Sequence, residues 1–135
     1  MSLPASVSAE PAAGRIQEGL TVALSRRNLV SADALVAVLV RGFDAAGRTP
    51  LMQGLPVAGV DGTLAERMKG TPAAGNVRAK TGAMNGVRSL AGYVTTQDGE
   101  PLAFAVVVNN YEGAASVAVA AIDALAVRLA GFSRR

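Results

Sequence analysis

The chain has 135 residues and a net charge of +3; half of its residues are hydrophobic and only 4% are aromatic. This length suits one domain or part of a larger one, and a charged fraction of only 17% argues against a disordered chain. The sequence has no Cys and no His, which excludes disulfides and thiolate metal sites and removes the usual general base. We therefore expect neither a metal nor a cofactor.

The residues at the start of the chain differ in composition from the rest. Residues 1–14 are small and polar and include two prolines, which predicts a loose leader, and we assign residues 15–135 to one folded segment. Met1-Ser2-Leu3 has the form of an expression start, and the sequence shows no signal peptide. Residues 15–30 fit either a helix or a short strand followed by a turn.

Two helices are predicted before the middle of the chain. Ser31 suits a helix N-cap, and the apolar residues after it repeat at helical spacing, which predicts a helix over residues 32–45. Residues 49–59 contain two prolines and two glycines and predict mostly loop, with one helical turn as the alternative. Residues 61–69 predict a short helix, which Gly70-Thr71-Pro72 would end.

The second half predicts a sheet and one further helix. Residues 76–81, 89–96 and 102–109 have strand composition, and the short loops at 82–86 and 97–100 favour antiparallel neighbours. Residues 104–108 are nearly all apolar, as expected of a strand covered on both faces. Residues 114–132 predict a long apolar helix packed across this sheet. The expected fold class is therefore α+β.

The most informative motif is Lys80-Thr81-Gly82, at the end of the first predicted strand. Lys-Thr-Gly is one of the motifs of penicillin-binding proteins and class A β-lactamases. A lysine there supplies positive potential, a threonine hydroxyl can bind a carboxylate, and a glycine lets a ligand approach the backbone. The N–H of the next residue, Ala83, could then face a developing oxyanion. The plainer alternative is a solvated lysine at a strand end.

Neighbouring segments strengthen the first interpretation. The stretches 56–64 (PVAGVDGTL), 77–82 (VRAKTG), 86–94 (GVRSLAGYV) and 24–31 (LSRRNLVS), in collinear order over residues 20–132, resemble one family. It is the serine D-alanyl-D-alanine carboxypeptidase/endopeptidase family of class C low-molecular-mass penicillin-binding proteins.

The resemblance implies the C-terminal part of a penicillin-binding, transpeptidase-like fold in an extracytoplasmic or periplasmic protein. Such enzymes are acylated on a serine by a peptidoglycan stem peptide or by a β-lactam, and the ester is then hydrolysed. It implies a catalytic role for Lys80 and substrate binding by Thr81, Gly82 and Ala83.

The sequence departs from the family pattern in several places. The residues three positions before Lys69 and Lys80 are Glu66 and Val77, so no Ser-x-x-Lys is present, and no Ser-x-Asn is present either. We therefore expect a C-terminal fragment that lacks the nucleophile and is inactive alone. Ala83 stands where the family usually has Ser or Thr, which removes a hydroxyl worth roughly 1.5–3 kcal/mol to a charged partner. The alternative function is a non-catalytic binding or structural module that keeps half of this fold.

The other polar candidates have ordinary interpretations. We expect surface or capping roles for Asp61 and Glu66, and solvated positions for Asp123 and Arg128 on the last helix. Arg78 and Arg88 flank the Lys-Thr-Gly turn; we expect solvent-facing strand positions, and the alternative is that they add positive potential for an anionic peptide. Tyr93 is expected to pack in the core.

Two expectations concern partners. The apolar strand 102–109 would lie at a sheet edge, so we expect either self-association through it or cover by the chain's own N-terminal residues. The basic residues are scattered, with Arg26-Arg27 and Arg134-Arg135 as the only pairs, which predicts no nucleic-acid partner. The most apolar stretch is interrupted by Asp123 and Arg128, so no run reaches the roughly 18 residues of a membrane span.

Overall fold

The computed structural model describes residues 29–134, and the helices and strands described lie in the unit Ser31–Arg135. The elements in chain order are α2 (Ala32–Arg41), α3 (Pro50–Gln53), the 3-10 turn η1 (Gly62–Leu64), β1 (Arg78–Met84), β2 (Val87–Thr95), β3 (Pro101–Asn109) and α4 (Ala115–Ala130). The predictions for residues 1–28 lie outside the described residues. None of the helices described is both long and apolar enough to cross a membrane.

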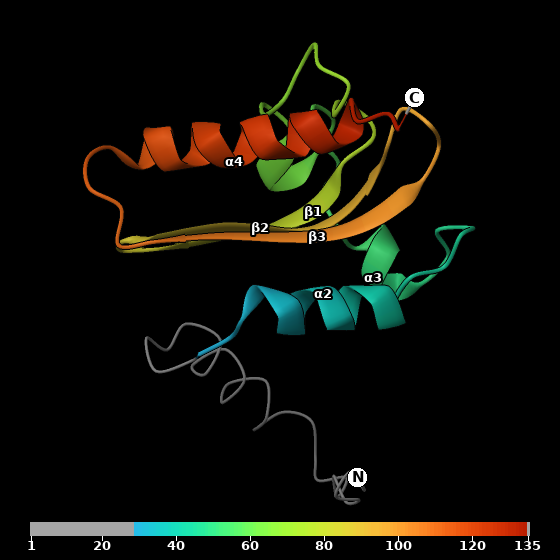
Figure 1. Ribbon diagram of the computed structural model, residues 1–135, viewed down its shortest axis with the longest axis horizontal. Helices are drawn as coiled ribbons and strands as arrows, with labels where there is room; N and C mark the ends of the chain where they lie inside the picture. Colours follow the sequence, from blue (N-terminus) through green and yellow to red (C-terminus); the bar gives the residue numbers. More distant parts are fainter. Residues whose placement is uncertain (1–28, 135) are drawn as a thin grey trace, which may run out of the picture. The chain divides into compact units, whose positions relative to one another are not determined.

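The strands form one antiparallel sheet in the order β1-β2-β3, with α4 on one face and α2 on the other (Figure 1). This arrangement confirms the predicted α+β class and the prediction that the last helix packs across the sheet. On one face β3 contacts α2, and on the other its Phe104 lies in the core cluster that includes residues of α4, which explains the nearly continuous apolar run.

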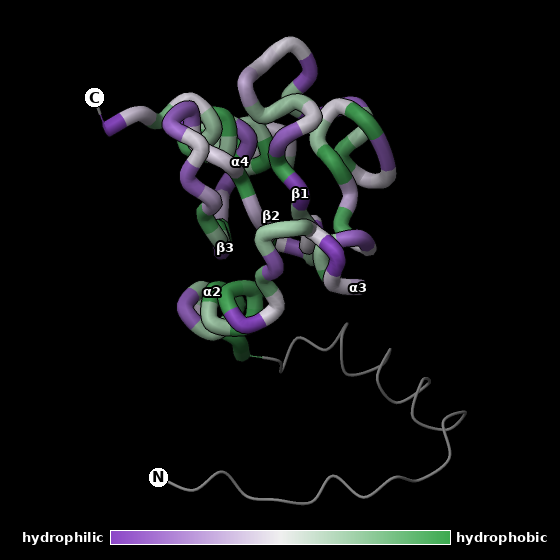
Figure 2. Tube along the Cα trace, turned by 90° about the vertical axis from the view of Figure 1, so that its right-hand side faces the viewer, coloured by the Kyte–Doolittle hydropathy of each residue, from purple (hydrophilic) through white to green (hydrophobic). Residues whose placement is uncertain are grey.

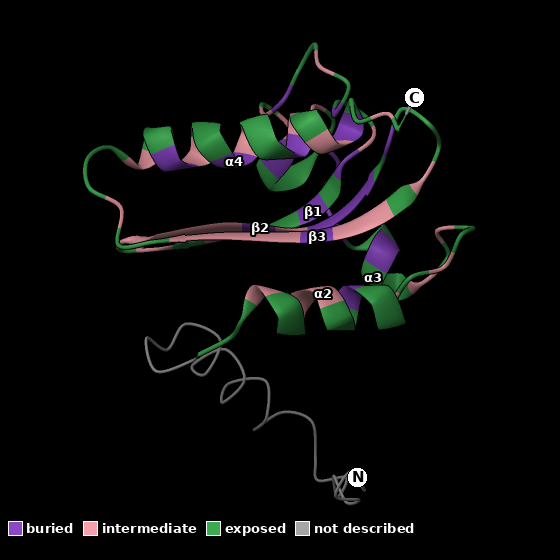
Figure 3. Ribbon diagram, viewed as in Figure 1, coloured by how far each residue is buried: buried purple, intermediate pink, exposed green. Residues whose placement is uncertain are grey.

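The main core lies between the sheet and α4. Ile122, Ala126 and Ala130 on α4 pack in the same buried cluster as Leu90, Val94 and Phe104 on the strands. Figure 3 shows that the buried side of α4 faces the sheet while its outer side is exposed. Since the helix contributes mostly alanines, much of the apolar area in this core comes from the strands and from the loop before β1.

A smaller core joins α2 and α3 to the opposite face. It contains Leu39, Met52, Leu55 and Tyr93, and the Tyr93 hydroxyl donates a hydrogen bond to the Leu39 carbonyl at 2.6 Å. On either side of Leu39, Val38 and Val40 are 62% and 61% exposed, so apolar residues extend around α2 beyond its packed side (Figure 2).

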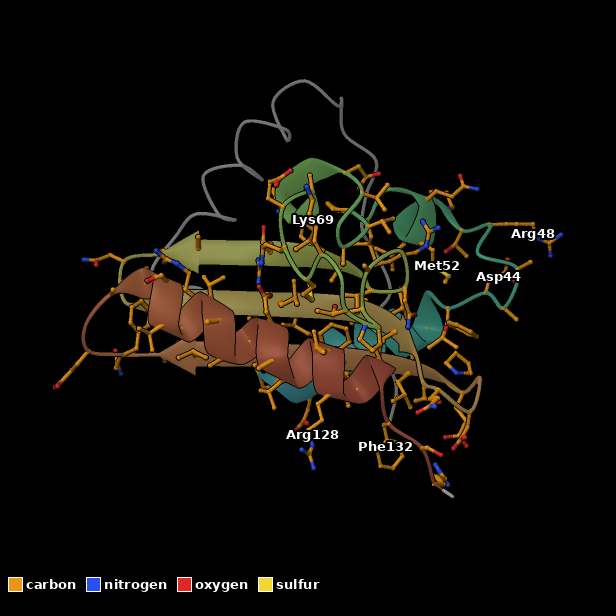
Figure 4. All side chains as sticks on the ribbon, turned by 90° about the horizontal axis from the view of Figure 1, so that it is seen from above. Asp44, Arg48, Met52, Lys69, Arg128 and Phe132 are labelled. Atoms are coloured by element: carbon orange, nitrogen blue, oxygen red, sulfur yellow. The ribbon has the colours of Figure 1, made fainter. Side chains whose placement is uncertain are left out.

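The predicted helix 32–45 is too long. Ser31 is the N-cap as expected and accepts a hydrogen bond from the Ala34 N–H, but α2 ends at Arg41, where Gly42 is the C-cap. Beyond it the Asp44 carboxylate accepts hydrogen bonds from the Arg48 N–H and Nε, which stabilises a loop; the two side chains lie together in Figure 4. This local bonding satisfies backbone groups without continuing the helix.

The predicted helix 61–69 is wrong beyond its first turn. Only the 3-10 turn Gly62–Leu64 forms there. Asp61 does not cap a following N–H; its Oδ1 instead accepts a hydrogen bond from the Val57 N–H at 2.7 Å. Met68 and Gly70 then have φ values of 59° and 68°, which an α-helix cannot accommodate.

The predicted strands are correct in number and pairing but shifted at their ends. The first was expected over 76–81 and is observed over Arg78–Met84. The Asn76 side chain, rather than its backbone, makes the hydrogen bonds to the N–H and C=O of Thr95, so the strand begins after it. The second begins at Val87 and the third at Pro101. Gly82 therefore lies inside a strand, and the predicted turn 82–86 contracts to Asn85-Gly86.

Candidate functional site

Lys80, Thr81, Gly82 and Ala83 all lie in β1, an edge strand of the sheet. The register places Lys80 opposite Ala91, Thr81 opposite Leu90 and Ala83 opposite Arg88. Residues directly opposite share a face, so Lys80 lies on the face of Tyr93 and α2, whereas Thr81 and Ala83 lie on the face of α4. The three-residue motif thus presents groups on both faces of one strand.

The outer edge of β1 is occupied at its beginning. The Ala79 N–H donates to the Pro56 carbonyl at 2.9 Å, and the Ala58 N–H donates to the Val77 carbonyl at 2.9 Å. These bonds fix which backbone groups face outward, because successive residues of a strand direct their N–H and C=O to alternate sides. If Ala79 points outward, then Thr81 and Ala83 also present their N–H and C=O at this edge.

Lys80 extends toward the same edge. Its exposed ammonium donates to the Thr81 carbonyl at 3.0 Å. A positive charge, an outward carbonyl at Thr81 and an outward N–H at Ala83 therefore lie within one short stretch of β1. Such an edge can accept an extended peptide by backbone pairing, and it presents a positive charge to an anionic ligand.

Thr63 is a residue of this site that the sequence did not reveal. It lies in η1, and its hydroxyl is hydrogen-bonded to that of Thr81 at 3.2 Å across 18 positions of sequence. Two hydroxyl groups have two protons, and the bond between them uses only one. The pair therefore keeps one proton that it can donate to a ligand oxygen beside the motif.

A small hollow of about 200 Å³ lies on the α4 face of this site. Its lining contains Thr63, Arg67, Thr81, Gly82, Ala83, Arg88, Ser89, Val119 and Ile122. The lining includes two arginines and no acidic residue. A second hollow, of about 460 Å³, lies around Phe43, Met52, Arg78 and Tyr93 and includes no residue of the motif.

The two arginines of the smaller hollow differ in their partners. Arg67 is paired with Asp123 of α4, with Nε at 3.1 Å from both carboxylate oxygens. This pair corrects the expectation that Asp123 is a solvated charge, since its side chain is only 21% exposed. Arg128 on the same helix is exposed, as expected, and points away from the sheet in Figure 4.

The remaining candidates are Asp61, Glu66 and Tyr93. Asp61 is exposed and accepts a hydrogen bond from the Val57 N–H, and Glu66 pairs with Lys69 at 2.7 Å. Both therefore lie at the surface as expected, but neither side chain caps a helix. Tyr93 is 5% exposed, and desolvation by burial raises the pKa of its hydroxyl above the usual value. Among residues 29–134 no cluster of three or more metal-ligating side chains is present.

Comparison with known proteins gives consistent matches. Residues 20–131 match the family of D-Ala-D-Ala carboxypeptidase 3 (S13). The chain is 50% identical over 115 residues to the D-alanyl-D-alanine carboxypeptidase of Actinomadura sp. strain R39, covering 82% of this chain and 21% of that protein. It is 41% identical over 90 residues to the D-alanyl-D-alanine carboxypeptidase DacB of Haemophilus influenzae, covering 65% and 19%.

Solved structures show the same relationship. The crystal structure of penicillin-binding protein 4 (dacB) of Haemophilus influenzae complexed with a β-lactam superposes with a TM-score of 0.62 at 40% identity, over 67% of this chain and 21% of that one. A penicillin G-acylated predatory endopeptidase of Bdellovibrio bacteriovorus, in complex with an immunity protein, gives a TM-score of 0.54 at 27% identity, over 71% and 26%. The chain spans about one-fifth of the length of the curated relatives named here. With the family match covering most of its residues, the chain belongs to the D-Ala-D-Ala carboxypeptidase 3 (S13) family of penicillin-binding proteins.

Proposed function

We propose that this chain supplies one wall of the active site of a serine D-alanyl-D-alanine carboxypeptidase or endopeptidase. The observation that carries the proposal is the position of Lys80-Thr81-Gly82 on the open edge of β1. Family membership supports it, because the relatives are named as carboxypeptidases and two of the related structures hold a β-lactam or penicillin. The whole protein would then act on peptidoglycan stem peptides outside the cytoplasm, for example in the periplasm.

The roles follow from the contacts of each residue. Lys80 supplies positive potential at the edge, where a catalytic serine and the substrate carboxylate would lie. The Thr81 and Thr63 hydroxyls bind the carboxylate. Gly82 has no side chain because a Cβ there would lie 2.2 Å from the Ser89 Oγ, so the glycine keeps β1 close to β2. The N–H of Ala83 faces outward and can stabilise the oxyanion of the tetrahedral intermediate.

The printed sequence has no Ser-x-x-Lys, so the nucleophile must come from elsewhere in an active protein. We expect no covalent adduct when the 135-residue chain is incubated with a fluorescent penicillin. A covalent adduct on this chain would contradict the proposal that the chain forms a wall of the active site but does not carry the nucleophile. A non-catalytic binding module would also give no adduct, so a second experiment is needed to separate these two functions.

That experiment is a chimera, in which residues 20–131 replace the matching segment of the Actinomadura carboxypeptidase. We expect the chimera to release D-alanine and to bind penicillin covalently. Lys80→Ala in the chimera should lower the rate of release about 10²- to 10³-fold, the range typical of losing a group that stabilises charge in the transition state. Arg78→Gln, on the same strand and the same face but two residues earlier, is the matched control. Full activity of the Lys80→Ala chimera would refute the catalytic role.

We also propose that the outer edge of β3 pairs with a second copy of the chain. Within the part of the molecule that is described, no strand lies beside this edge. The strand carries no charged residue, and its one proline is at the first position, so it lacks the usual features that prevent pairing. The other expectation, cover by the N-terminal residues, concerns residues outside those described.

A further inference from the structure

We infer that Arg88 is a specificity-determining residue, which recognises the terminal carboxylate of the peptide in the hollow beside Thr81. The inference rests on the proposed function, because it adds a carboxylate-binding group to the same site. Ala83, the residue after the motif, has no hydroxyl to offer a ligand. Directly opposite Ala83 in the sheet, and on the same face, β2 carries Arg88.

The position of Arg88 suits a ligand at Thr81. Thr81 is two residues from Ala83 on β1, so it is a diagonal neighbour of Arg88 on the α4 face. Diagonal neighbours in an antiparallel pair lie about 7–8 Å apart, within reach of a long side chain. Both residues line the hollow of about 200 Å³, together with Thr63 and Ala83. This volume exceeds by several times the roughly 30 Å³ that one water occupies in the liquid.

The charge of Arg88 is not neutralised by an ion pair in the described structure. One terminal nitrogen, Nη1, donates to the Met84 and Val87 carbonyls at 2.6 and 2.7 Å. Arg67, the other arginine of the hollow, is instead paired with Asp123. Since no acidic residue lines the hollow, Arg88 gives it a net positive charge that favours an anion.

The guanidinium is also held in place before any ligand binds. Its two carbonyl contacts fix one terminal nitrogen, and its carbon lies 5.8 Å from the centre of the Tyr111 ring. The remaining nitrogens can donate to a carboxylate in the planar geometry that arginine favours. An ordered side chain loses less conformational entropy on binding, so the contact should contribute measurable affinity.

The test is an NMR titration of the ¹⁵N-labelled 135-residue chain with N-acetyl-D-alanyl-D-alanine and, separately, with its C-terminal amide. In the unsubstituted chain we expect both ligands to shift the Thr81 and Ala83 amide signals, with the acid binding about tenfold more tightly. Arg88→Gln should weaken the acid about tenfold and leave the amide unchanged. Arg88→Lys should restore part of the preference through its charge. Arg78→Gln, on the opposite face, should keep the full preference.

The outcomes separate the two proposals. If the ligands shift the β1 signals and Arg88→Gln keeps the preference for the acid, the role of Arg88 is refuted while the peptide-binding edge stands. If neither ligand shifts the β1 signals, peptide binding by this edge in the chain is refuted, and the role of Arg88 with it. A loss of folding in a variant would appear as collapsed signal dispersion. In that case the ratio of acid affinity to amide affinity in Arg88→Lys decides. A lower ratio than in the unsubstituted chain supports the role of Arg88, and an unchanged ratio indicates a purely structural arginine.

Discussion

Gly92 sets how closely the motif-bearing strand approaches its neighbour, and Gly92→Ala should displace it. Gly92 lies opposite Ala79, one residue before Lys80. A methyl group at Gly92 would stand 2.0 Å from the Arg78 carbonyl oxygen and 2.6 Å from the Ala79 Cα. Ordinary contact begins near 3.4 Å, so β1 would have to move by about 1.4 Å. Both obstructing groups are backbone, and no side-chain rotation can relieve the overlap.

We expect Gly92→Ala to lower the free energy of unfolding by about 3 kcal/mol, the upper part of the usual range for overpacking. Urea denaturation followed by circular dichroism measures this change, and amide signals of residues 78–84 should shift most in the NMR spectrum. Gly131→Ala is the matched control, since its methyl would meet its nearest neighbour at 3.6 Å. This control should change stability by less than about 1 kcal/mol. A loss below about 1 kcal/mol for Gly92→Ala would refute the close-approach explanation.

Two further predictions concern β2 and β3. Tyr93→Phe should cost about 1–2 kcal/mol in urea denaturation, because the buried Leu39 carbonyl loses its donor. Burial raises the pKa of the Tyr93 hydroxyl. In the unsubstituted chain, the stability that the neutral hydroxyl contributes should therefore be complete below pH 10 and fall as the pH rises further. The same pH dependence of stability in Tyr93→Phe would contradict this prediction. Light scattering should show a dimer of the unsubstituted chain. Val107→Lys on β3 should abolish the dimer, whereas Val117→Lys on the exposed side of α4 should not. A monomeric unsubstituted chain would exclude pairing through β3.

The sequence allowed the sheet and its last helix to be predicted because each rests on a local pattern. The strand composition of residues 89–96 and 102–109 and the Asp98-Gly99 turn between them predict a hairpin without reference to the rest of the chain. The boundaries were less accurate where a side chain binds a distant backbone group. Asn76, for example, is bonded to Thr95, and this bond moves the beginning of β1 to Arg78.

The candidate site was predicted only in the part that is contiguous in sequence. Lys80-Thr81-Gly82 is visible as a motif, whereas Thr63 meets Thr81 only through the loop that brings η1 beside β1. The pairing of Arg67 with Asp123 joins residues 56 positions apart, so no periodicity could indicate it. The same holds for the hollow that Arg88 lines together with Thr63 and Thr81. Contacts of this kind depend on tertiary packing rather than on local propensity.

The division of the motif between two faces restricts how the remaining part of an active site can be arranged. Lys80 lies on the α2 face and Thr81 on the α4 face, yet the Lys80 ammonium and the outward backbone groups of Thr81 and Ala83 meet at the open edge of β1. Under the proposed function, a segment that carries the nucleophile would therefore approach this edge rather than either face. A peptide paired along the edge would then lie between that segment and β1, with its carboxylate directed toward the α4 face. On that face lie Thr63, Thr81 and Arg88, the side chains suited to bind a carboxylate.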